Sequence, residues 1–412
     1  MSRFVSVKLR EITHLITDGK HGDCENETNS GYYFISAKDV RNWTINYDNV
    51  REITKADFLD THRRTRFEID DVVVVSTGAN IGDIALAKDK DKTVRTTFQK
   101  SVAIIKTDKT KADPHFIAYF LNNSRTELHN VSSGSAQKNL LLKDLRDFKI
   151  NLPSLPTQKR IASILSAYDD LIENNLKRIK LLEEIAQRTY EEWFVKFRVN
   201  GEQLPMDEAT GLPLGWKQIT VNDYAEVIGK GPSLNYDFQG QKYPVINQSC
   251  VRNGEIELEK VLYAQELNAN KEYCYLKTND ILINSMGQGT LGRVSKNVSI
   301  RNERFIIHNC ITFLRAKKEL SQFQLYYFIS SKQSYLISVS QGSTGQTTLK
   351  QSLVGDLEII LPTNSILNSF NNIIEPIWNQ MGVLKNQNSS LKQSRDILLP
   401  RLMNGTINVE SK

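Results

Sequence analysis

The feature that most constrains this chain is an internal duplication whose period is about half the chain length. Six segments of the first half recur in the second half, in the same order and at offsets of 207 to 211 residues. Solenoid repeats have periods of roughly 20–50 residues, so this period indicates two copies of one domain. The matched pairs are Val40–Asn42 with Val251–Asn253, Asp71–Gly78 with Asp280–Gly287, Gln99–Ile104 with His308–Phe313, Phe116–Leu121 with Phe323–Phe328, Gly134–Leu140 with Gly342–Leu349, and Leu152–Pro153 with Leu361–Pro362.

Within each copy the residue pattern predicts a mixture of strands and short helices. Val72–Val75 is β-branched and apolar and runs into a polar turn, which is typical of a buried strand. Phe116–Leu121 is expected to begin a short amphipathic helix, with Asp113-Pro114 as its start signal. Each copy then has a short strand that proline stops, at Ile150–Pro153 and at Ile359–Pro362.

A long helix is predicted after each copy. Residues 157–197 contain neither Pro nor Gly, and their apolar residues recur every seven positions, as in a coiled coil. A single long helix with one apolar stripe needs a partner in water, and the second such helix is the economical one. The expected seam positions are Leu165, Ile172, Ile179, Ala186 and Trp193, with Ile161, Tyr168, Asn175 and Leu182 beside them, and, in the second helix, Phe370, Ile377, Leu384, Leu391 and Leu398, with Ile366 and Ile373 beside them.

Two residues interrupt these stripes. Asn175 is either a polar seam residue that fixes the register of the helices or a frayed, solvent-facing position. Pro376 must kink the second helix or mark the point where it restarts.

Composition permits a nucleic-acid partner and offers no sign of catalysis. The 412 residues include 53 Lys and Arg against 47 Asp and Glu, a formal charge of +6, and this mild excess is compatible with a local basic face. The four cysteines form no CxxC pair, the first ten residues lack the apolar segment of a signal peptide, and no apolar run could span a bilayer. Phosphate-loop and amino-methyltransferase tetrapeptide motifs are absent. Glu68, Asp70 and Asp71 precede a strand and could suggest a nuclease metal site, although acidic residues there usually form turns.

Several motifs together resemble those of the specificity subunit of Type I restriction–modification systems, over nearly the whole chain. One departure lies in the second copy, where Leu361–Asn364 lacks the second Leu-Pro and the Gln found at Leu155–Gln158. That departure leaves open whether the second helix starts in the same way. The motifs are the Asp18–His21 loop, the Asp71–Gly82 strand and turn, the Gly134–Leu140 loop, the Leu152–Ile161 junction, the Pro213–Trp216 entry to the second copy, and the terminal Leu398–Ile407.

The resemblance implies an α+β fold in which two similar target-recognition domains are separated by two long antiparallel coiled-coil helices, in a pseudo-two-fold repeat. It also implies a cytoplasmic, non-catalytic subunit that reads the two halves of a split DNA site. Its implied partners are double-stranded DNA and two modification subunits, which use S-adenosylmethionine, and two motor-nuclease subunits can join them for cleavage. The expected parts are a first target-recognition domain at 1–155, a central spacer helix at 156–198, a linker at 199–215, a second target-recognition domain at 216–363 and a C-terminal spacer helix at 364–407.

The expected DNA contacts lie in polar turns that follow the buried strands. Bases are read by hydrogen-bonding side chains and phosphates are held by cations, and glycine-rich turns let the backbone approach the duplex. The alternative is that these Ser, Gly and Asn residues only build turns. The candidates are Lys20, His21, Ser76, Thr77, Asn80, Lys100 and Lys138 in the first copy, and Lys230, Ser285, Gln288, Asn309, Thr344 and Gln346 in the second.

Three other functions stay open at this point. The chain could be the specificity subunit of a related Type IIB-like system, which only the partner chains would reveal. It could be a coiled-coil interaction protein without a DNA role, or an enzyme that is active alone.

Overall fold

The computed structural model describes residues 4–41, 43–132, 138–237, 242–252, 254–265, 272–287, 289–298, 304–340 and 348–409. It divides into two compact units, and each joins one globular domain to part of the two long helices. Unit 1 comprises Met1–Glu173 with Ser390–Lys412, and unit 2 comprises Asn174–Ser389. The duplicated α+β organisation expected from the sequence is confirmed.

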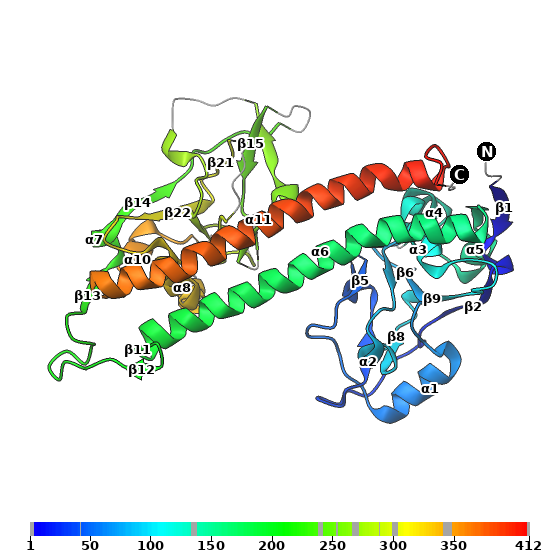
Figure 1. The fold of residues 1–412 in the computed structure, drawn as a ribbon, viewed down its shortest axis with the longest axis horizontal. Helices are drawn as coiled ribbons and strands as arrows, with labels where there is room; N and C mark the ends of the chain where they lie inside the picture. The colour runs from blue at the N-terminus through cyan, green and yellow to red at the C-terminus, as the bar shows by residue number, and fades with distance from the viewer. Residues whose placement is uncertain are drawn as a thin grey trace. The chain divides into compact units, whose positions relative to one another are not determined.

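The core of unit 1 is an antiparallel four-stranded sheet with the strand order β2-β9-β6-β7. Figure 1 labels three of its strands, β2, β9 and β6. In the central strand β6, Val72 and Val74 belong to the core that includes helix α3, whereas Val73 and Val75 belong to a second apolar core. Successive side chains of a strand point to opposite faces, so a strand covered on both faces is apolar throughout. The bounds are β2 (Thr13–Asp18), β6 (Val72–Val75), β7 (Ile84–Leu86) and β9 (Val102–Thr107).

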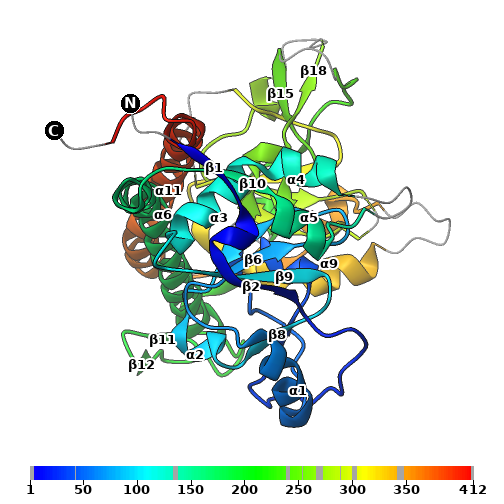
Figure 2. The same cartoon turned by 90° about the vertical axis from the view of Figure 1, so that its right-hand side faces the viewer.

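Smaller elements surround this sheet. β1 pairs antiparallel with β10, β3 pairs parallel with β8, and helix α1 lies beside β8 (Figure 2). Their bounds are β1 (Val5–Lys8), β3 (Tyr33–Ile35), β4 (Val40–Arg41), β5 (Thr44–Ile45), α1 (Lys55–Thr65), α2 (Lys90–Thr93), β8 (Thr96–Phe98), α3 (Pro114–Asn123), α4 (Arg125–Val131), α5 (Leu142–Asp147) and β10 (Lys149–Leu152), with 3-10 helices at Leu9–Glu11 and Ala37–Asp39.

Helix α3 begins where the sequence predicts, but it is not amphipathic. The side chain of Asp113 accepts a hydrogen bond from the backbone N–H of Phe116 at 2.9 Å, which caps the helix. Every residue from Phe116 to Leu121 is buried. The helix shares one apolar core with the sheet and with residues of both long helices, such as Ile161 and Leu402, so it has no solvent-facing stripe.

Unit 2 repeats the sheet with the order β14-β22-β19-β20, again antiparallel. β13 pairs with β23, and β15 lies between β18 and β21. The bounds are β13 (Lys217–Thr220), α7 (Val221–Tyr224), β14 (Ala225–Lys230), β15 (Tyr243–Ile246), β16 (Val251–Arg252), β17 (Glu255–Ile256), β18 (Leu262–Ala264), β19 (Ile281–Asn284), β20 (Val294–Lys296), β21 (Ile306–Ile307), β22 (Ile311–Ala316), α8 (Gln322–Ser331), α9 (Gln333–Val339), α10 (Gln351–Gly355) and β23 (Glu358–Leu361), with 3-10 helices at Leu258–Lys260 and Glu272–Cys274.

Each unit has its own core, built from corresponding elements, and a peripheral segment differs between the described parts of the two units. The caps of α3 and α8 are Asp113 and Ser321, so Tyr119 corresponds to Tyr327 and not to Tyr326, with which the sequence match pairs it. Helix α1 of unit 1 falls where unit 2 has strand β18 and the 3-10 helix Glu272–Cys274.

The long helices α6 (Leu155–Tyr190) and α11 (Asn364–Met403) lie side by side and antiparallel within each unit (Figure 1). In unit 2 Asn175 contacts Asn388, and the ring of Trp193 lies 5.9 Å from that of Phe370. The later residue of the first helix therefore contacts the earlier residue of α11, as antiparallel helices require. α11 starts 209 residues after α6, so the departure at Leu361–Asn364 does not change the helix start.

The predicted seam is confirmed in α6 and is partly wrong in α11. Ile373 is 40% exposed, whereas Leu367 and Ile374 are buried. In α11 the buried companions Leu367, Ile374 and Met381 each lie three residues before a main position, and the expectation placed the companions four before. Helix α11 runs unbroken through Pro376, so it does not restart there. The buried main positions are Leu165, Ile172, Ile179, Ala186, Trp193, Phe370 and Leu384.

Asn175 is a buried seam residue and not a frayed position. Its Nδ2 donates to Oδ1 of Asn388 at 2.9 Å, and both side chains are buried. A buried amide pair in an apolar seam is satisfied in one alignment of the two helices, so it favours that register.

The segment expected to be a linker is partly structured. A π-helical turn at Glu191–Val195 ends α6, and β11 (Arg198–Val199) then pairs with β12 (Glu202–Gln203). The ring of Trp216 packs on Phe194 and Phe197, which anchors the entry to the second domain.

Candidate nucleic-acid interface

Four loops meet at one end of the unit 1 sheet and define the unit 1 loop cluster, residues 18–21, 76–80, 98–101 and 138–140. Backbone hydrogen bonds hold them together. The N–H of Lys100 donates to the carbonyl of Lys20 at 3.1 Å, and the N–H of Ser76 donates to that of Ser101 at 2.9 Å. The N–H of Leu140 donates to the carbonyl of Ser76 at 2.8 Å. These loops lie between residues 18 and 140 of the sequence, and the sheet brings them together.

Unit 2 builds the same frame from its own loops, the unit 2 loop cluster, residues 230–232, 285–287, 307–310 and 348–350. The N–H of Asn309 donates to the carbonyl of Pro232 at 3.1 Å, and the N–H of Ser285 donates to that of Cys310 at 2.8 Å. The N–H of Leu349 donates to the carbonyl of Ser285 at 2.9 Å. These three backbone bonds therefore recur in unit 2, while the side chains on the frame differ. The bond from the N–H of Lys20 to the carbonyl of Phe98, at 2.7 Å, has no counterpart, because Pro232 has no N–H.

A glycine in each cluster makes the close loop crossing possible. A Cβ added to Gly19 would lie 1.9 Å from the carbonyl oxygen of Phe98, and one added to Gly231 would lie 1.4 Å from that of Ile307. No side chain fits at such a distance, so both positions need glycine.

Five of the expected contact residues of unit 1 have side chains at least partly open to solvent. His21, Lys100 and Lys138 are exposed, and Thr77 and Asn80 are half-buried. The Thr77 hydroxyl donates to Oδ1 of Asn139 at 3.1 Å, and Nζ of Lys138 lies 3.3 Å from Nδ1 of His129. The loop cluster thus presents cations and hydrogen-bonding groups together, which is the combination that DNA contacts require.

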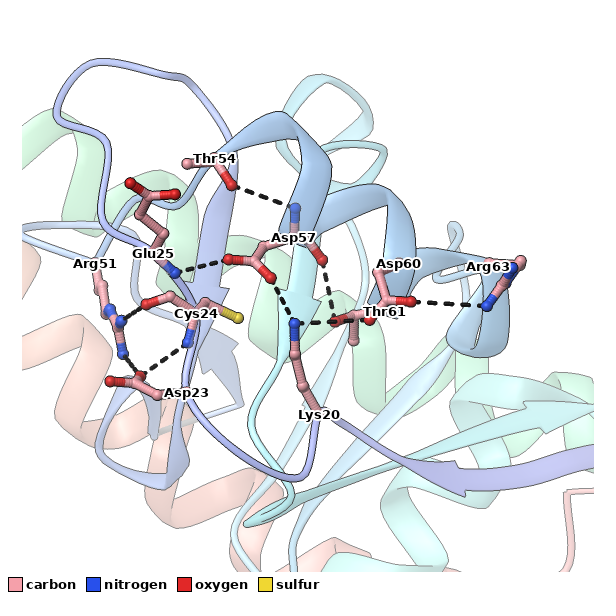
Figure 3. Close-up of polar contacts among 10 residues, drawn as sticks. All are labelled: Lys20, Asp23, Cys24, Glu25, Arg51, Thr54, Asp57, Asp60, Thr61 and Arg63. Carbon is pink, nitrogen blue, oxygen red and sulfur yellow. Dashed lines mark hydrogen bonds and ion pairs between the residues drawn. The ribbon is translucent and has the colours of Figure 1, made fainter.

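Lys20 lies in the cluster, but its charge is engaged by helix α1. Its Nζ lies 2.5 Å from Oδ1 of Asp57 and 3.6 Å from Oδ2 of Asp60 (Figure 3). The hydrogen bond to Asp57 raises the pKa of Lys20 above its ordinary value. Asp57 also accepts from the backbone N–H of Glu25, so the pair fixes the loop after β2 against α1.

Arg64 is a residue that sequence reasoning missed. Its guanidinium donates to the carbonyls of Asp18, at 2.8 Å, and of Gly19. It therefore holds the first loop of the cluster from helix α1. The sequence signal was weak, because α1 lies outside the duplicated segments; only the run of cations at Arg63, Arg64 and Arg66 marked it.

Two of the expected contact side chains are buried, and that of Lys230 is half-buried and bonded to the backbone. The side chain of Ser285 is fully buried, and its hydroxyl lies 2.5 Å from that of Thr312. Ser76 is 4% exposed and donates to the carbonyl of Lys100. Nζ of Lys230 donates to the carbonyl of Leu349 at 3.3 Å, and burial lowers its pKa. These three side chains stabilise the loop clusters. For Ser76 and Ser285 this agrees with the alternative that such residues only build turns.

The remaining candidates are in unit 2. Asn309 is half-buried in the unit 2 loop cluster. Gln288, Thr344 and Gln346 lie outside the described residues.

The acidic residues before the strands are structural. Asp71 is 4% exposed, binds Nζ of Lys106 at 2.7 Å and accepts from the N–H of Glu68. Burial raises its pKa to about 6. Asp280 binds Arg315 in the same way, so both carboxylates cap a turn and neutralise a buried cation. In the described parts of the chain, no three His, Cys, Asp or Glu side chains gather closely enough to hold a metal ion.

Comparison with known proteins agrees with this geometry. The family model described as "Type I restriction modification DNA specificity domain" matches residues 1–184 and again residues 213–393. The chain belongs to this family and carries its domain twice.

Relatives and a solved structure extend the likeness over the whole chain. The chain is 26% identical to the Type I restriction enzyme MjaIX specificity subunit of Methanocaldococcus jannaschii, over 92% of this chain and 87% of that protein. It is 24% identical to the Type I restriction enzyme HindI specificity subunit of Haemophilus influenzae, over 71% of this chain and 77% of that protein. The crystal structure of the Type I restriction–modification system S subunit from M. genitalium superposes with a TM-score of 0.60 at 16% identity, covering 97% and 96% of the two chains.

The chain is accordingly a specificity subunit of the Type I restriction–modification class and not the catalyst of that system. Across the described residues, no helix has the length and apolar character needed to cross a membrane.

Proposed function

We propose that each globular domain is a target-recognition domain that reads one half of a bipartite DNA site. The observation that carries this proposal is the repeated loop frame. The same three backbone hydrogen bonds organise each loop cluster, and the polar side chains on the two frames differ. One frame with two sets of side chains suits two readers of unlike sequences.

The side chains divide by the kind of contact that they can make. Lys100 and Lys138 are exposed cations suited to phosphates, which set affinity. Thr77, Asn80 and Asn309 carry hydrogen-bonding groups suited to base edges in the major groove. His21, whose Nε2 lies 2.8 Å from Oδ2 of Asp18, belongs to the proposed contact set of unit 1, and Lys20 and Lys230 position the loops. Gln288, Thr344 and Gln346 stay in the proposed contact set on the strength of the sequence repeat.

The long helices are the proposed docking surface for two modification subunits. Leu181 and Ile185, both in the unit 2 part of α6, are each more than half exposed. At 3.6 residues per turn they lie within an arc of about 40°, which leaves an apolar patch open to a partner. In this proposal the modification subunits bring the S-adenosylmethionine, two restriction subunits join for cleavage, and the complex acts in the cytoplasm, where it meets host DNA.

The experiment is to sequence the methylated adenines of the host with the gene present, deleted, or replaced by two matched variants. Asn80→Ala and Asn309→Ala each remove one half-buried amide, the first from the unit 1 loop cluster and the second from the unit 2 loop cluster. We expect the deletion to abolish methylation of one bipartite sequence. Each variant should relax one half of that sequence and leave the other half unchanged.

Two results would contradict the proposal. One is a methylation pattern that does not depend on the gene. The other is a variant that alters both halves equally, because the two clusters would then not be separate readers.

A further inference from the structure

A carboxylate orients one histidine of the unit 1 loop cluster. Nε2 of His21 lies 2.8 Å from Oδ2 of Asp18, in the loop that follows β2. A carboxylate can only accept a hydrogen bond, so Nε2 carries the hydrogen and donates it. Within the described residues Nδ1 of His21 has no hydrogen-bond partner, and the side chain is 63% exposed. The imidazole is thus held by one nitrogen and offers the other to a ligand.

The carboxylate of Asp18 is itself paired with a cation. Its Oδ1 lies 3.3 Å from Nη2 of Arg64, and the Asp18 side chain is half-buried. Arg64 also donates to the backbone carbonyls of Asp18 and Gly19. The charge of Asp18 is therefore balanced from helix α1, so a proton on His21 adds one net positive charge to the loop. An anion beside Nδ1 is the natural partner for that charge.

Unit 2 has different side chains at the equivalent positions. The two crossing glycines are equivalent, so Lys230 stands where unit 1 has Asp18, and Ser233 stands where it has His21. Lys230 donates to a backbone carbonyl, and Ser233 is an exposed hydroxyl that carries no charge near neutral pH. The shared backbone frame therefore does not need the carboxylate and the imidazole, which points to a contact made by unit 1.

Basic groups outnumber carboxylates among the other charged groups of this loop and its neighbours. The aspartates are each paired with a cation. Histidine is the side chain whose charge changes between about pH 5 and 8, and His129, which lies beside Lys138, is another histidine of this set. The set therefore favours an anionic partner. It consists of Lys20, Arg51, Arg63, Arg64, Lys100, His129 and Lys138, with Asp18, Asp23, Glu25, Asp57 and Asp60.

We infer that protonated His21 binds a phosphate group of the duplex through Nδ1, and that Asp18 is the positioning residue that orients its ring. The inference rests on the proposed function, because it takes the loop cluster to face DNA. A charged N–H donor suits a phosphate oxygen, and such a contact fixes the position of the duplex without reading its sequence. The neutral ring has a lone pair at Nδ1, which repels that oxygen. Unit 1 therefore binds DNA more tightly at low pH, and the gain is lost as the pH rises and the imidazole gives up its proton.

The test measures binding of a duplex with the methylated sequence to the full chain, assembled with the modification subunits, at about pH 6 and about pH 8. His21→Gln keeps a hydrogen-bonding side chain that is uncharged in both conditions. We expect the Kd of the wild type, relative to that of His21→Gln, to be about tenfold lower at the lower pH, as for one charge-assisted hydrogen bond. The slope of log K against log salt should also steepen by about 0.9. Titration of His129 and of the partner subunits is common to both proteins and cancels in this ratio.

Two further variants make the result interpretable. Asp18→Asn keeps the imidazole but removes the carboxylate that orients it, so most of the gain at low pH should be lost. A merely structural role of Asp18 would weaken binding equally at both pH values. Hydrogen exchange of β2 in each variant reports whether the fold is kept.

His14→Gln is the matched control. His14 is 68% exposed, and its Nε2 lies 3.7 Å from Oδ1 of Asp108, so it is also an exposed histidine beside a carboxylate. It lies near the start of β2, whereas His21 follows the end of that strand, about 20 Å away along the chain. His14→Gln should therefore keep the full gain at low pH.

The outcomes separate this inference from the proposed function. If the wild-type assembly does not bind duplex DNA, the proposed function fails. If it binds, and the ratio of its Kd to that of His21→Gln is the same at both pH values, the inference is overturned, whether or not Asp18→Asn folds. A full gain in folded Asp18→Asn would overturn the positioning role. A gain that is lost in His21→Gln and Asp18→Asn and kept in His14→Gln supports the inference.

Discussion

Each unit has a buried aspartate just before a central strand of its sheet, and the two aspartates pair with different cations. Removing the charge of each aspartate by mutation should therefore cost different amounts of stability. In unit 2, Asp280 is 1% exposed and accepts from Nε and Nη2 of Arg315, both at 2.7 Å. Arg315 also donates to the backbone carbonyls of Tyr273 and Tyr275. Asp280→Asn keeps the shape of the side chain and removes its charge.

The expected cost is large in unit 2. The guanidinium of Arg315 keeps its charge inside a protein, and its side chain is only 8% exposed. Within the described residues its one ion pair is with Asp280, so Asp280→Asn leaves a buried charge without a counterion. Breaking a buried pair by removing one partner costs about 3–5 kcal/mol.

The same change in unit 1 should cost less. Lys106 contacts Asp71 at 2.7 Å and also the exposed Glu68 at 2.9 Å, so a carboxylate remains. Burial raises the pKa of Asp71 to about 6, which means that ionised Asp71 carries a desolvation cost that Asp71→Asn relieves. We expect a loss of about 1–2 kcal/mol, the scale of a buried hydrogen bond.

Hydrogen exchange read by mass spectrometry measures both losses in one molecule. A global melting curve is unsuitable, because a chain of two units need not unfold in one step. Local opening free energies of Val72–Val75 and Ile281–Asn284 report the two sheets separately. The double variant Asp280→Asn, Arg315→Met serves as the control, since removing both charges should recover most of the lost stability.

Equal losses in the two sheets would refute this reasoning. So would a double variant as unstable as Asp280→Asn alone, because the cost would then not come from an unpaired arginine.

Four further expectations follow from the structure. Lys138→Ala should weaken binding to every duplex and reduce the slope of log K against log salt by about 0.9, as measured by anisotropy; an unchanged slope removes Lys138 from the contacts. Asn175→Ala should lower the free energy of unfolding of unit 2 by about 1–2 kcal/mol, whereas the double change of Asn175 and Asn388 to Leu should restore or raise stability, as hydrogen exchange of α6 would show. Gly19→Ala should abolish sequence-specific binding in gel-shift assays, because the new Cβ would overlap the carbonyl of Phe98. Removing one heptad from α6 and one from α11 shortens each helix by about 10 Å, and we expect the gap between methylated half-sites to shrink by about 3 base pairs at 3.4 Å per pair; an unaltered gap would rule out a spacer role.

Elements that depend on local pattern were predictable from the sequence. The four valines of β6, the Asp113 cap of α3 and the heptads of α6 are all set by neighbours a few residues apart, and each was found as expected. Long-range packing caused the misses. Helix α3 was expected to have one side open to solvent, but packing against both long helices buries that side.

The candidate site shows the same division. The internal repeat predicted where both loop clusters lie, because the strands that position them belong to the duplicated segments. It could not tell which side chains point outward: Ser76 and Ser285 lie in the right turns, yet their hydroxyls face inward, to a backbone carbonyl in one case and to Thr312 in the other. Nor could it show that Arg64, on a helix outside the duplicated segments, holds the loop at Asp18.

The repeat itself explains which residues are free to vary. Backbone bonds hold the part of the frame that both loop clusters share, as in the bonds of Leu140 and Leu349 to their serines, and these bonds do not depend on exposed side chains. In unit 1 the exposed Arg64 adds bonds to the carbonyls of Asp18 and Gly19. Side chains such as Thr77 and Asn80 can therefore change without loss of the frame. We expect substitutions to disrupt the frame mainly at two kinds of position, the glycines where loops cross and the residues of the buried ion pairs. In such a chain, the residues that stabilise the fold differ from the residues proposed to contact DNA bases. Substitutions at the proposed base contacts should therefore change sequence specificity at little cost in stability.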